Sequence, residues 1–382
     1  LGAGGAPGSV NPGNGDMTVG GMLQPGASAG GSASAGGTAS NAAGGSESTD
    51  PVAAAGGTGG TAPVVEPGPV VGPVRSELPA PPTSGVAQPA GTPGNLRVID
   101  WAGFTGAISY TFDDSNSSQI NNYTALNNLG VPFSFYLQTG KVQESSNPIW
   151  AQAVADGHEL GNHTQSHQST GANIGADTDA ATQFIQSRFG VTVFTMAAPN
   201  GSGDYAAIAQ SRFLINRGVN DQLIRPNDNT NPFNLPCLIP GDDAQVGVFN
   251  TKVDLVRQNR AWQTILVHGF NGGTDGAFNS GDLSVFLDAV TYAKSFPDVW
   301  IDTLLEVAAY WRAQKTLSSV TPAVNGSETT WTWTLPDHFP PDRFLRVTVD
   351  GGRLTQGGAT IAWDEHGYYE IALDEGSVTL SP

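Results

Sequence analysis

Residues 107–114 read Ala-Ile-Ser-Tyr-Thr-Phe-Asp-Asp, and this stretch decides the fold that we expect of the chain. Its first six residues are apolar or favour β structure, so they predict a short strand that ends at two adjacent carboxylates. Similar short runs recur at 133–137, 191–196, 213–215 and 264–267. The chain therefore contains a series of short strands, the first of which ends in a pair of acids.

Helical segments separate several of these strands, and we expect them at 119–128, 148–156, 177–188, 205–212 and 283–294. Strands that alternate with helices predict a parallel sheet covered by helices. The expected fold class is therefore α/β, a distorted or incomplete (β/α) barrel. In such barrels the carboxyl ends of the strands form the rim on which chemistry takes place.

The two ends of the chain differ from this middle part in composition and in pattern. Residues 1–95 consist mostly of Gly, Ala, Ser, Thr and Pro, which bury too little apolar surface to offset the entropy of ordering, so we expect a disordered tether. Beyond residue 315, apolar residues alternate with period two and turn signals separate the runs. We therefore assign 96–315 to the α/β domain and 316–382 to a small antiparallel β-sandwich.

Charge and composition narrow the classes of partner. The chain has 382 residues and a net charge of −18, which argues against nucleic acid and anionic membrane surfaces and leaves a neutral or cationic polymer. The one cysteine, Cys237, permits no internal disulfide, and no apolar run is long enough to span a bilayer. A Gly/Ser-rich tether and a first residue other than Met favour an exported product, secreted or tethered to a bacterial surface. The composition gives no indication of the oligomeric state.

A histidine pair supplies the first candidate for a metal site. Residues 157–167 read Gly-His-Glu-Leu-Gly-Asn-His-Thr-Gln-Ser-His, which places His163 and His167 four residues apart. Two histidines at this spacing can share one metal ion, and Asp114 would complete a His–His–Asp set with a coordination position left for water. Taken alone, each pattern also has a simpler interpretation, as surface histidines and as carboxylates at a turn or helix start.

The remaining candidates suggest hydrolysis. Of the two adjacent carboxylates, one would hold the metal, and the other would accept a proton from water activated by the metal. His268 follows the expected strand at 264–267 and is either an ordinary core histidine or a general acid that protonates a departing amine or alcohol.

The order of these motifs resembles a known family. Thr-Phe-Asp-Asp is followed by Gly-His-Glu-Leu-Gly-Asn-His-Thr-x-x-His, then by a Pro-x-Gly loop and by Leu-Val-His. This order is similar to that of the polysaccharide deacetylases, the NodB-like carbohydrate esterases, over roughly residues 100–315. The resemblance implies a distorted (β/α) barrel with one divalent ion at its rim, usually Zn²⁺, with Co²⁺, Ni²⁺ or Mn²⁺ as alternatives.

The resemblance also implies a role for each candidate. Asp113 would be the catalytic base and His268 the catalytic acid. The metal ligands would be Asp114, His163 and His167.

The chain departs from the family pattern at two motifs. Many members carry an arginine two residues before the proline of the third motif, where this chain has Ala197. Arg217, which follows the expected strand at 213–215, is a candidate to orient Asp113 instead, and the alternative is a surface arginine. The fourth motif, an Asp/Trp signature that supports the catalytic histidine, has no clear match, and Asp221 is the candidate for its role.

The Pro-x-Gly loop remains in place, with Pro199 followed by Asn200. The backbone N–H of Asn200 could donate to a developing oxyanion.

These observations predict a metal-dependent hydrolase that removes acetyl groups from a carbohydrate. The substrate would be a glycan that contains N-acetylglucosamine, such as chitin or peptidoglycan, or an O-acetylated glycan such as xylan. One alternative is a glycan-binding module on the cell surface that has kept the metal and lost catalysis. Another is a structural surface protein whose working parts are the tether and the β domain.

Overall fold

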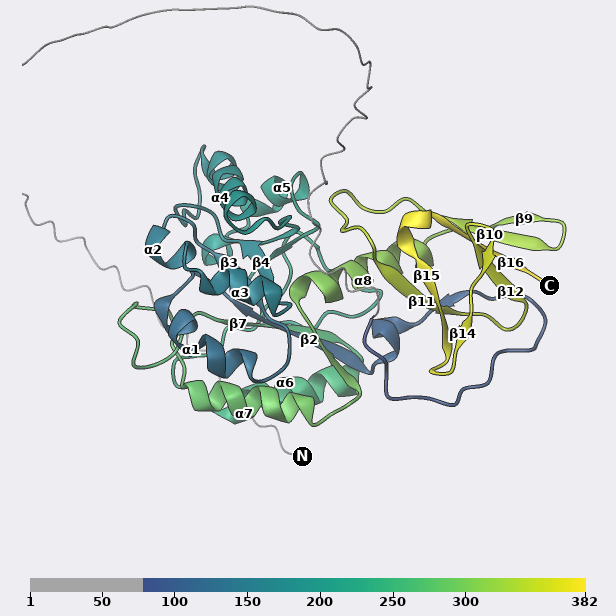
Figure 1. Cartoon of the computed structure of the whole chain (residues 1–382), viewed down its shortest axis with the longest axis horizontal. Helices are drawn as coiled ribbons and strands as arrows, with labels where there is room; N and C mark the ends of the chain where they lie inside the picture. Colours follow the sequence, from purple (N-terminus) through teal and green to yellow (C-terminus); the bar gives the residue numbers. More distant parts are fainter. Residues whose placement is uncertain (1–77) are drawn as a thin grey trace, which may run out of the picture. The chain divides into compact units, whose positions relative to one another are not determined.

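The computed structural model describes residues 78–382, so residues 1–77 of the predicted tether lie outside the described part. A curled parallel sheet is the centre of the larger domain (Figure 1). Its strand order is β6-β5-β4-β3-β2-β7, and β8 pairs with the first half of β2. The predicted α/β fold is confirmed as a curled, incomplete barrel. Its strands are β2 (Gly106–Phe112), β3 (Ser134–Leu137), β4 (Glu159–Asn162), β5 (Thr195–Ala197), β6 (Ile215–Arg217), β7 (Trp262–Val267) and β8 (Val299–Ile301).

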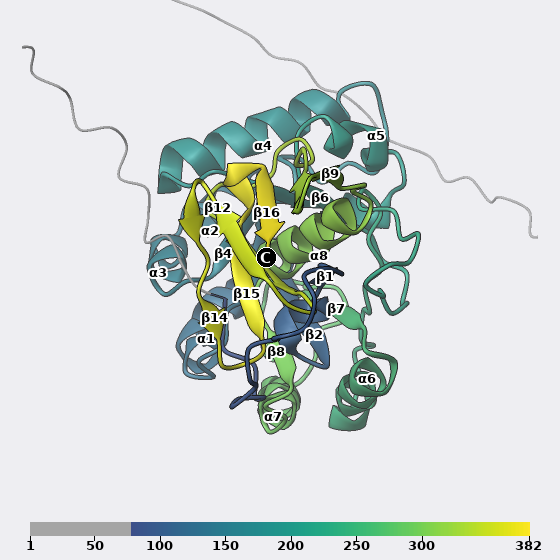
Figure 2. The same cartoon turned by 90° about the vertical axis from the view of Figure 1, so that its right-hand side faces the viewer.

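Helices connect the strands, and most of them cover the outer face of the sheet, whereas α8 packs against the inner core (Figures 1 and 2). The five expected helical segments all occur, and the structure also has α2, α6 and α8. Within residues 78–382, every helix is too short or too polar to cross a membrane. The helices are α1 (Ser117–Asn127), α2 (Val142–Ser145), α3 (Ile149–Ala155), α4 (Ile174–Phe189), α5 (Tyr205–Gln210), α6 (Val246–Asn259), α7 (Leu283–Lys294) and α8 (Leu304–Ser318), with short 3₁₀ turns η1 (Asp100–Gly103), η2 (Pro199–Gly201) and η3 (Leu373–Glu375).

An irregular segment fills the gap between the edge strands β6 and β7. Leu235 donates to the carbonyl of Asn216 at 2.9 Å and accepts from the N–H of Gly218 at 2.8 Å, so it lies along β6. Three residues later, Leu238 forms a parallel bridge to Ile265 on β7. The proline between the two leucines has no N–H, which prevents one continuous ladder. Isolated bridges, and not a continuous ladder, therefore connect β6 to β7 through this segment.

Aromatic side chains fill both sides of the sheet. On the outer side, Phe112 of β2 stacks on Phe135 of β3 with ring centroids 5.1 Å apart and meets Phe286 of α7 at 5.5 Å. On the inner side, Trp262 of β7 lies 6.2 Å from Trp311 of α8. Burial of each such side chain contributes about 1.5–3 kcal/mol. Because β2 is buried on both faces, it appears in the sequence as a nearly continuous apolar run.

The C-terminal part forms two antiparallel sheets, as predicted. The orders are β1-β11-β15-β14 and β13-β12-β16-β10-β9. Leu345 and Ile371 of the first sheet share a buried core with Trp331 and Leu380 of the second, so the sheets form a sandwich. The strands are β1 (Arg97–Val98), β9 (Ala323–Asn325), β10 (Glu328–Thr332), β11 (Phe344–Thr348), β12 (Arg353–Gln356), β13 (Ala359–Thr360), β14 (Trp363–Asp364), β15 (Tyr368–Ala372) and β16 (Ser377–Ser381).

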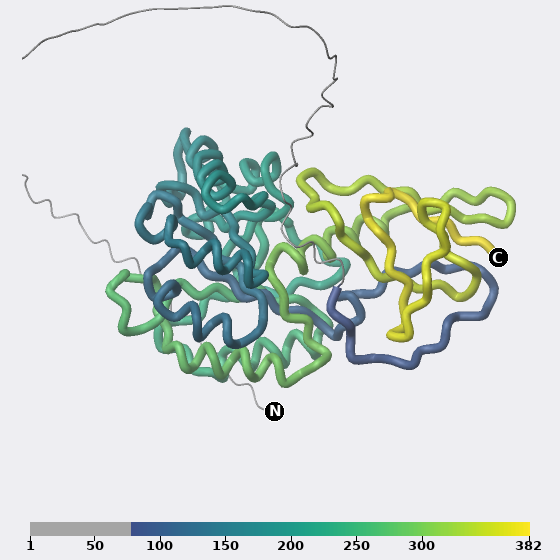
Figure 3. Tube along the Cα trace, in the orientation of Figure 1, coloured from purple at the N-terminus to yellow at the C-terminus, as the bar shows by residue number. Residues whose placement is uncertain are grey.

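Residues 78–95 differ from the expected tether, because they run along this sandwich (Figure 3). The N–H of Val86 donates to Glu365 O at 2.8 Å, and the N–H of Gly91 donates to Asp350 O at 2.9 Å. Strand β1 then pairs with β11. The segment has no large apolar side chains in a periodic pattern, so its order comes from backbone contacts that the sequence does not reveal. The β domain therefore includes residues that precede the barrel in the sequence as well as residues that follow it.

Arg346 of β11 connects this segment to η1 and to the β domain through hydrogen bonds. Its guanidinium donates to the carbonyls of Leu78 and Pro79 at 2.9 Å each and to that of Ala102 at 2.7 Å. Its Nε donates to Glu370 at 3.2 Å. The side chain is buried, so it replaces the water that these carbonyls would otherwise bind.

We predict that Arg346→Met lowers the free energy of unfolding by about 3–5 kcal/mol, because removal of a buried charge leaves its polar partners without a donor. Denaturant unfolding measures this loss, and limited proteolysis shows whether residues 78–95 become cleavable first. The control is Arg353→Met at an exposed position of β12, which should change stability by no more than about 0.5 kcal/mol. Equal unfolding midpoints for both variants would contradict the role of Arg346.

Candidate active site

The alternation of side chains along the strands aims the candidate residues into the barrel mouth. On β2, Ile108, Tyr110 and Phe112 belong to the outer core, so the next residue, Asp113, faces inward. On β7, Ile265 and Val267 belong to that same outer core, which turns His268 inward.

The same parity holds on the neighbouring strands. Tyr136, Ala197 and Ile215 belong to the inner core, and Arg217 is two residues after Ile215. Asn162 points outward to Thr178 on α4, at 2.9 Å, so His163 faces inward. The candidate residues therefore meet at one rim because the strands are parallel and in register.

Asp114, His163 and His167 form a candidate metal site. Their ligand atoms all lie within 4.8 Å of one another. Asp114 Oδ1 is 3.3 Å from His163 Nε2 and 3.4 Å from His167 Nε2. Two ligand atoms about 2.1 Å from one ion at the tetrahedral angle would lie roughly 3.4 Å apart, so the spacing suits zinc or a similar ion.

The hydrogen bonding of His163 supports the same assignment. Its Nδ1 lies 2.9 Å from the carbonyl of Ala197, which requires a proton on Nδ1 and leaves the lone pair of Nε2 directed toward Asp114. A backbone carbonyl behind a histidine is a common support for a metal ligand. The donor set of two imidazoles and one carboxylate therefore fits a catalytic zinc-type ion.

The charges of the three residues influence one another. Burial alone would raise the pKa of Asp114, but the hydrogen bond and charge of His163 outweigh it and hold that pKa well below the usual value. Burial and the neighbouring His163 lower the pKa of His167. Burial alone would lower the pKa of His163, but the charges of Asp113 and Asp114 outweigh burial, so the pKa of His163 is raised. A proton and a metal ion therefore compete for His163 Nε2.

Both loops that carry the ligands contain backbone in the left-handed region. The φ angles are +73° at Asp114, +56° at Ser115, +61° at Thr164 and +57° at His167. Such angles are costly for residues other than glycine, and they persist only where surrounding contacts hold them. The N–H of His167, for example, donates to Thr164 Oγ1 at 3.0 Å. Two of the three candidate ligands, Asp114 and His167, thus have a strained backbone.

Asp113 and Arg217 form a buried ion pair beside the metal site. Arg217 Nη2 donates to Asp113 Oδ1, and both side chains are almost fully inaccessible to water. Asp113 Oδ2 lies 3.6 Å from His163 Nε2. Burial alone would raise the pKa of Asp113, but the charges of Arg217, His163 and His268 outweigh it and lower that pKa. Arg217 thus occupies a position from which it can orient Asp113, although Ala197 stands where many relatives have an arginine.

His268 is fixed through its backbone. Its carbonyl accepts hydrogen bonds from Asn116 Nδ2 at 2.8 Å and from Gln119 Nε2 at 2.7 Å, and Gln119 Nε2 also donates to the carbonyl of Asp113 at 2.5 Å. Gln119 therefore ties the ends of β2 and β7 together. Burial lowers the pKa of His268. The buried Nδ1 has no hydrogen-bond partner among residues 78–382.

Sequence reasoning missed Asn116 and Gln119. They belong to the first turn of α1 and the residue before it, directly after the acidic pair. Polar side chains there usually cap the helix, so nothing in their spacing pointed to β7.

Comparison with known proteins concerns mainly the α/β domain. Residues 105–215 match the sequence model of the polysaccharide deacetylase family. The resemblance to this family that the sequence motifs indicate is confirmed over these residues. A gellan lyase from Bacillus sp. is 27% identical over 339 residues, and the match covers 76% of this chain and 13% of that protein. The matched part of this chain thus corresponds to a small part of that relative.

Solved structures of similar proteins include a putative polysaccharide deacetylase from Mycobacterium smegmatis, with 16% identity and a TM-score of 0.43, covering 61% of this chain and 96% of that chain. A probable polysaccharide deacetylase from Pseudomonas aeruginosa PAO1 has 12% identity and a TM-score of 0.43, covering 55% and 92%. A family 4 acetyl xylan esterase from Clostridium thermocellum, solved with a cobalt ion, has 18% identity and a TM-score of 0.38, covering 53% and 89%.

Three further residues predicted from the sequence, Pro199, Asn200 and Asp221, lie in different surroundings. Pro199 is buried and Asn200 exposed in the turn η2, where Asn200 has a φ of +52° and donates from Nδ2 to Ser169 Oγ at 2.8 Å. Asp221 instead accepts from Lys252 Nζ of α6 at 2.6 and 2.7 Å. The carboxylate of Asp221 is thus paired with a lysine, and its support of His268 stays a prediction.

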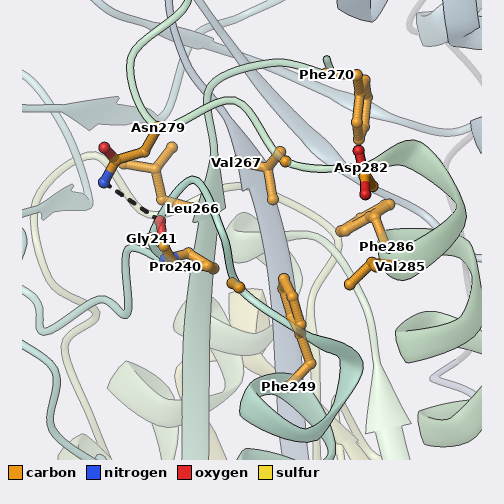
Figure 4. A pocket seen from close by; sticks show the side chains of 12 residues that line it. Pro240, Gly241, Phe249, Leu266, Val267, Phe270, Asn279, Asp282, Val285 and Phe286 are labelled. Carbon is orange, nitrogen blue, oxygen red and sulfur yellow. Dashed lines mark hydrogen bonds between the residues drawn. The ribbon is translucent and has the colours of Figure 1, made fainter.

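A mainly apolar pocket lies on the other side of β7 (Figure 4). Val267, Phe249 and Phe286 contribute to its wall, and Asn279 Nδ2 donates across it to the carbonyl of Pro240 at 3.3 Å. None of the predicted site residues lines it. It therefore belongs to the packing between β7, α6 and α7, and not to the metal site.

We predict that His163→Ala weakens zinc binding by at least about 100-fold, since loss of a residue that merely supports a ligand already costs 10- to 100-fold. Titration calorimetry with Zn²⁺, with metal analysis after dialysis, measures the change. His366→Ala is the matched control, because this histidine pairs with Asp364 in the β domain. Retained zinc affinity in the His163 variant would contradict the assignment of this ligand.

Proposed function

We propose that the chain is a metal-dependent hydrolase that removes acetyl groups from a carbohydrate. The observation that carries this proposal is the presence of Asp113, which is buried, and His268, which is partly buried, beside the candidate triad of Asp114, His163 and His167 at one barrel rim. A base, an acid and a set of metal ligands are the groups that hydrolysis of an amide or ester needs. The match of residues 105–215 to the polysaccharide deacetylase family supports the same reaction.

Asp114, His163 and His167 would hold the divalent ion. Such an ion supplies a lowered pKa for water and polarisation of a carbonyl oxygen. Asp113 would accept a proton from the water that attacks the acetyl carbon. The lowered pKa of its carboxyl keeps it ionised at neutral pH, as a base must be.

The other residues would act on the developing charge and the leaving group. The N–H of Asn200 would donate to the oxyanion, at the turn that follows β5. His268 would give a proton to the nitrogen or oxygen of the sugar as its bond to the acetyl carbon breaks. The products are acetate and a free amine or hydroxyl on the sugar. The ion pair of Asp113 with Arg217 would hold the base at a fixed angle throughout.

As the substrate we propose a glycan that contains N-acetylglucosamine, with O-acetylated xylan as the alternative. The net charge of −18 favours a neutral or cationic polymer over an anionic one. We further propose that the protein acts outside the cell, which its Gly/Ser-rich N-terminal composition supports. A zinc ion is the proposed cofactor, because two imidazoles and one carboxylate suit it.

We predict that Asp113→Asn lowers the rate of acetate release by about 100-fold or more, because an amide cannot accept the proton. The measurement follows acetate from chitin oligosaccharides, peptidoglycan fragments and acetylated xylan, with metal content determined in parallel. The control is Asp242→Asn, at an exposed position distant from the motifs in sequence. Full turnover by the Asp113 variant would refute the base assignment. Glycan binding by the wild-type chain without any acetate release would favour the binding-module alternative.

We predict that Arg217→Met moves the acidic limb of the kcat/KM profile to higher pH. Without the guanidinium, burial of Asp113 is less opposed, so its pKa rises and the base is protonated over a wider range of acidic pH. The pH profile of acetate release measures this shift. Arg225→Met, at an exposed position, serves as the control and should keep the wild-type profile. An acidic limb that stays in place or moves to lower pH would contradict the role of the pair.

A further inference from the structure

Phe278 is an exposed aromatic residue directly beside His268. Its side chain is 62% exposed, whereas most large apolar side chains of residues 78–382 are buried. The two ring centroids lie 5.4 Å apart, and the ring planes are nearly perpendicular at 87°. One part of the phenyl ring thus meets the histidine while most of it remains open to solvent. An exposed aromatic ring next to a candidate acid needs an explanation that core packing does not give.

The loop that carries Phe278 joins β7 to α7 and is fastened at its base. The N–H of Asn271 donates to Gly281 O at 2.9 Å, and the N–H of Gly281 donates to Gly269 O at 3.2 Å. Asn271 Nδ2 also donates to Asp282 Oδ1 at 2.7 Å. The two ends of the loop are therefore held together.

The crown of the loop is fastened as well. Asp275 Oδ2 accepts from the N–H of Ser118, at the start of α1, at 2.7 Å. A Cβ on Gly269 would lie 2.6 Å from Ala277 Cβ, so only glycine permits the loop to fold back so closely onto the end of β7. Asn279, the residue after Phe278, is bonded to Pro240 O across the pocket of Figure 4. The backbone on both sides of Phe278 is thus held in place.

The reaction places a sugar at this point. If His268 protonates the departing nitrogen or oxygen, that atom must come within about 3 Å of an imidazole nitrogen, and it is bonded directly to a carbon of the sugar ring. A pyranose presents C–H groups on its face, which pack favourably on an aromatic ring because the face of that ring carries partial negative charge. An exposed phenyl ring 5.4 Å from the imidazole, on a loop whose backbone is held in place, is within reach of that sugar or its neighbour.

We propose that Phe278 is a carbohydrate-binding residue that stacks on a pyranose ring of the substrate beside His268. This inference rests on the proposed function and adds the contact that selects a sugar over other acetylated compounds. It assigns Phe278 to binding and leaves the proton transfer to His268.

The test compares four variants, Phe278→Ala, Phe278→Leu, Phe278→Trp and Val324→Ala, in the full chain. The substrate is whichever of chitotetraose and acetylated xylotetraose the wild-type chain hydrolyses. We expect the Ala and Leu variants to raise KM about tenfold, because both lack an aromatic face. The Trp variant should bring KM back to within about twofold of wild type. Val324, 72% exposed on β9, is the control for loss of an exposed apolar side chain and should leave KM unchanged.

Each other outcome overturns a particular statement. A fall in kcat with unchanged KM would mean that Phe278 only positions His268, and the binding role would be wrong. Equal KM for the Leu and Trp variants would also exclude stacking. If the wild-type chain releases acetate but Phe278→Ala behaves like wild type, the subsite fails and the proposed function stands. If the wild-type chain releases no acetate from any glycan, the proposed function fails and the subsite fails with it.

Discussion

The buried ion pair between Asp113 and Arg217 is the interaction on which the rest of the site depends. Its two members come from β2 and β6, which three other strands separate in the sheet, so the pair forms only when the sheet curls until these strands face each other. Both charges have lost their water, and each compensates the other in a medium where an unpaired charge is costly. The curvature of the sheet therefore brings together the two charges, and their pairing keeps the carboxylate of Asp113 ionised.

Much of this arrangement could be predicted from the sequence because it follows from two regular features. Short apolar runs between helical segments predicted the parallel sheet, and period-two alternation beyond residue 315 predicted the sandwich. The positions of Asp113 and His268, each one residue past a strand whose alternate side chains face outward, follow from the same alternation. Arg217 was found because it ends a short strand, although the family pattern alone would have sought an arginine at Ala197.

Other features could not be predicted, for physical reasons that differ. Strand β4 lies inside the histidine motif, and β8 has three residues, so neither gives a clear pattern of its own. Residues 78–95 are ordered by backbone hydrogen bonds and by Arg346, contacts between parts of the chain far apart in sequence. Gln119 reaches the carbonyl of His268 from another element for the same reason. The sequence also does not reveal that Lys252 holds the carboxylate of Asp221.

The site requires three side chains from two loops to close around one divalent ion while Asp113 stays free to act as a base. The most direct measurement is anomalous diffraction at the zinc edge from crystals grown with Zn²⁺. We expect one strong peak about 2.0–2.2 Å from His163 Nε2, His167 Nε2 and an oxygen of Asp114, with Asp113 still paired to Arg217. A peak coordinated by Asp113, or one at another place with the two imidazoles unligated, would contradict it.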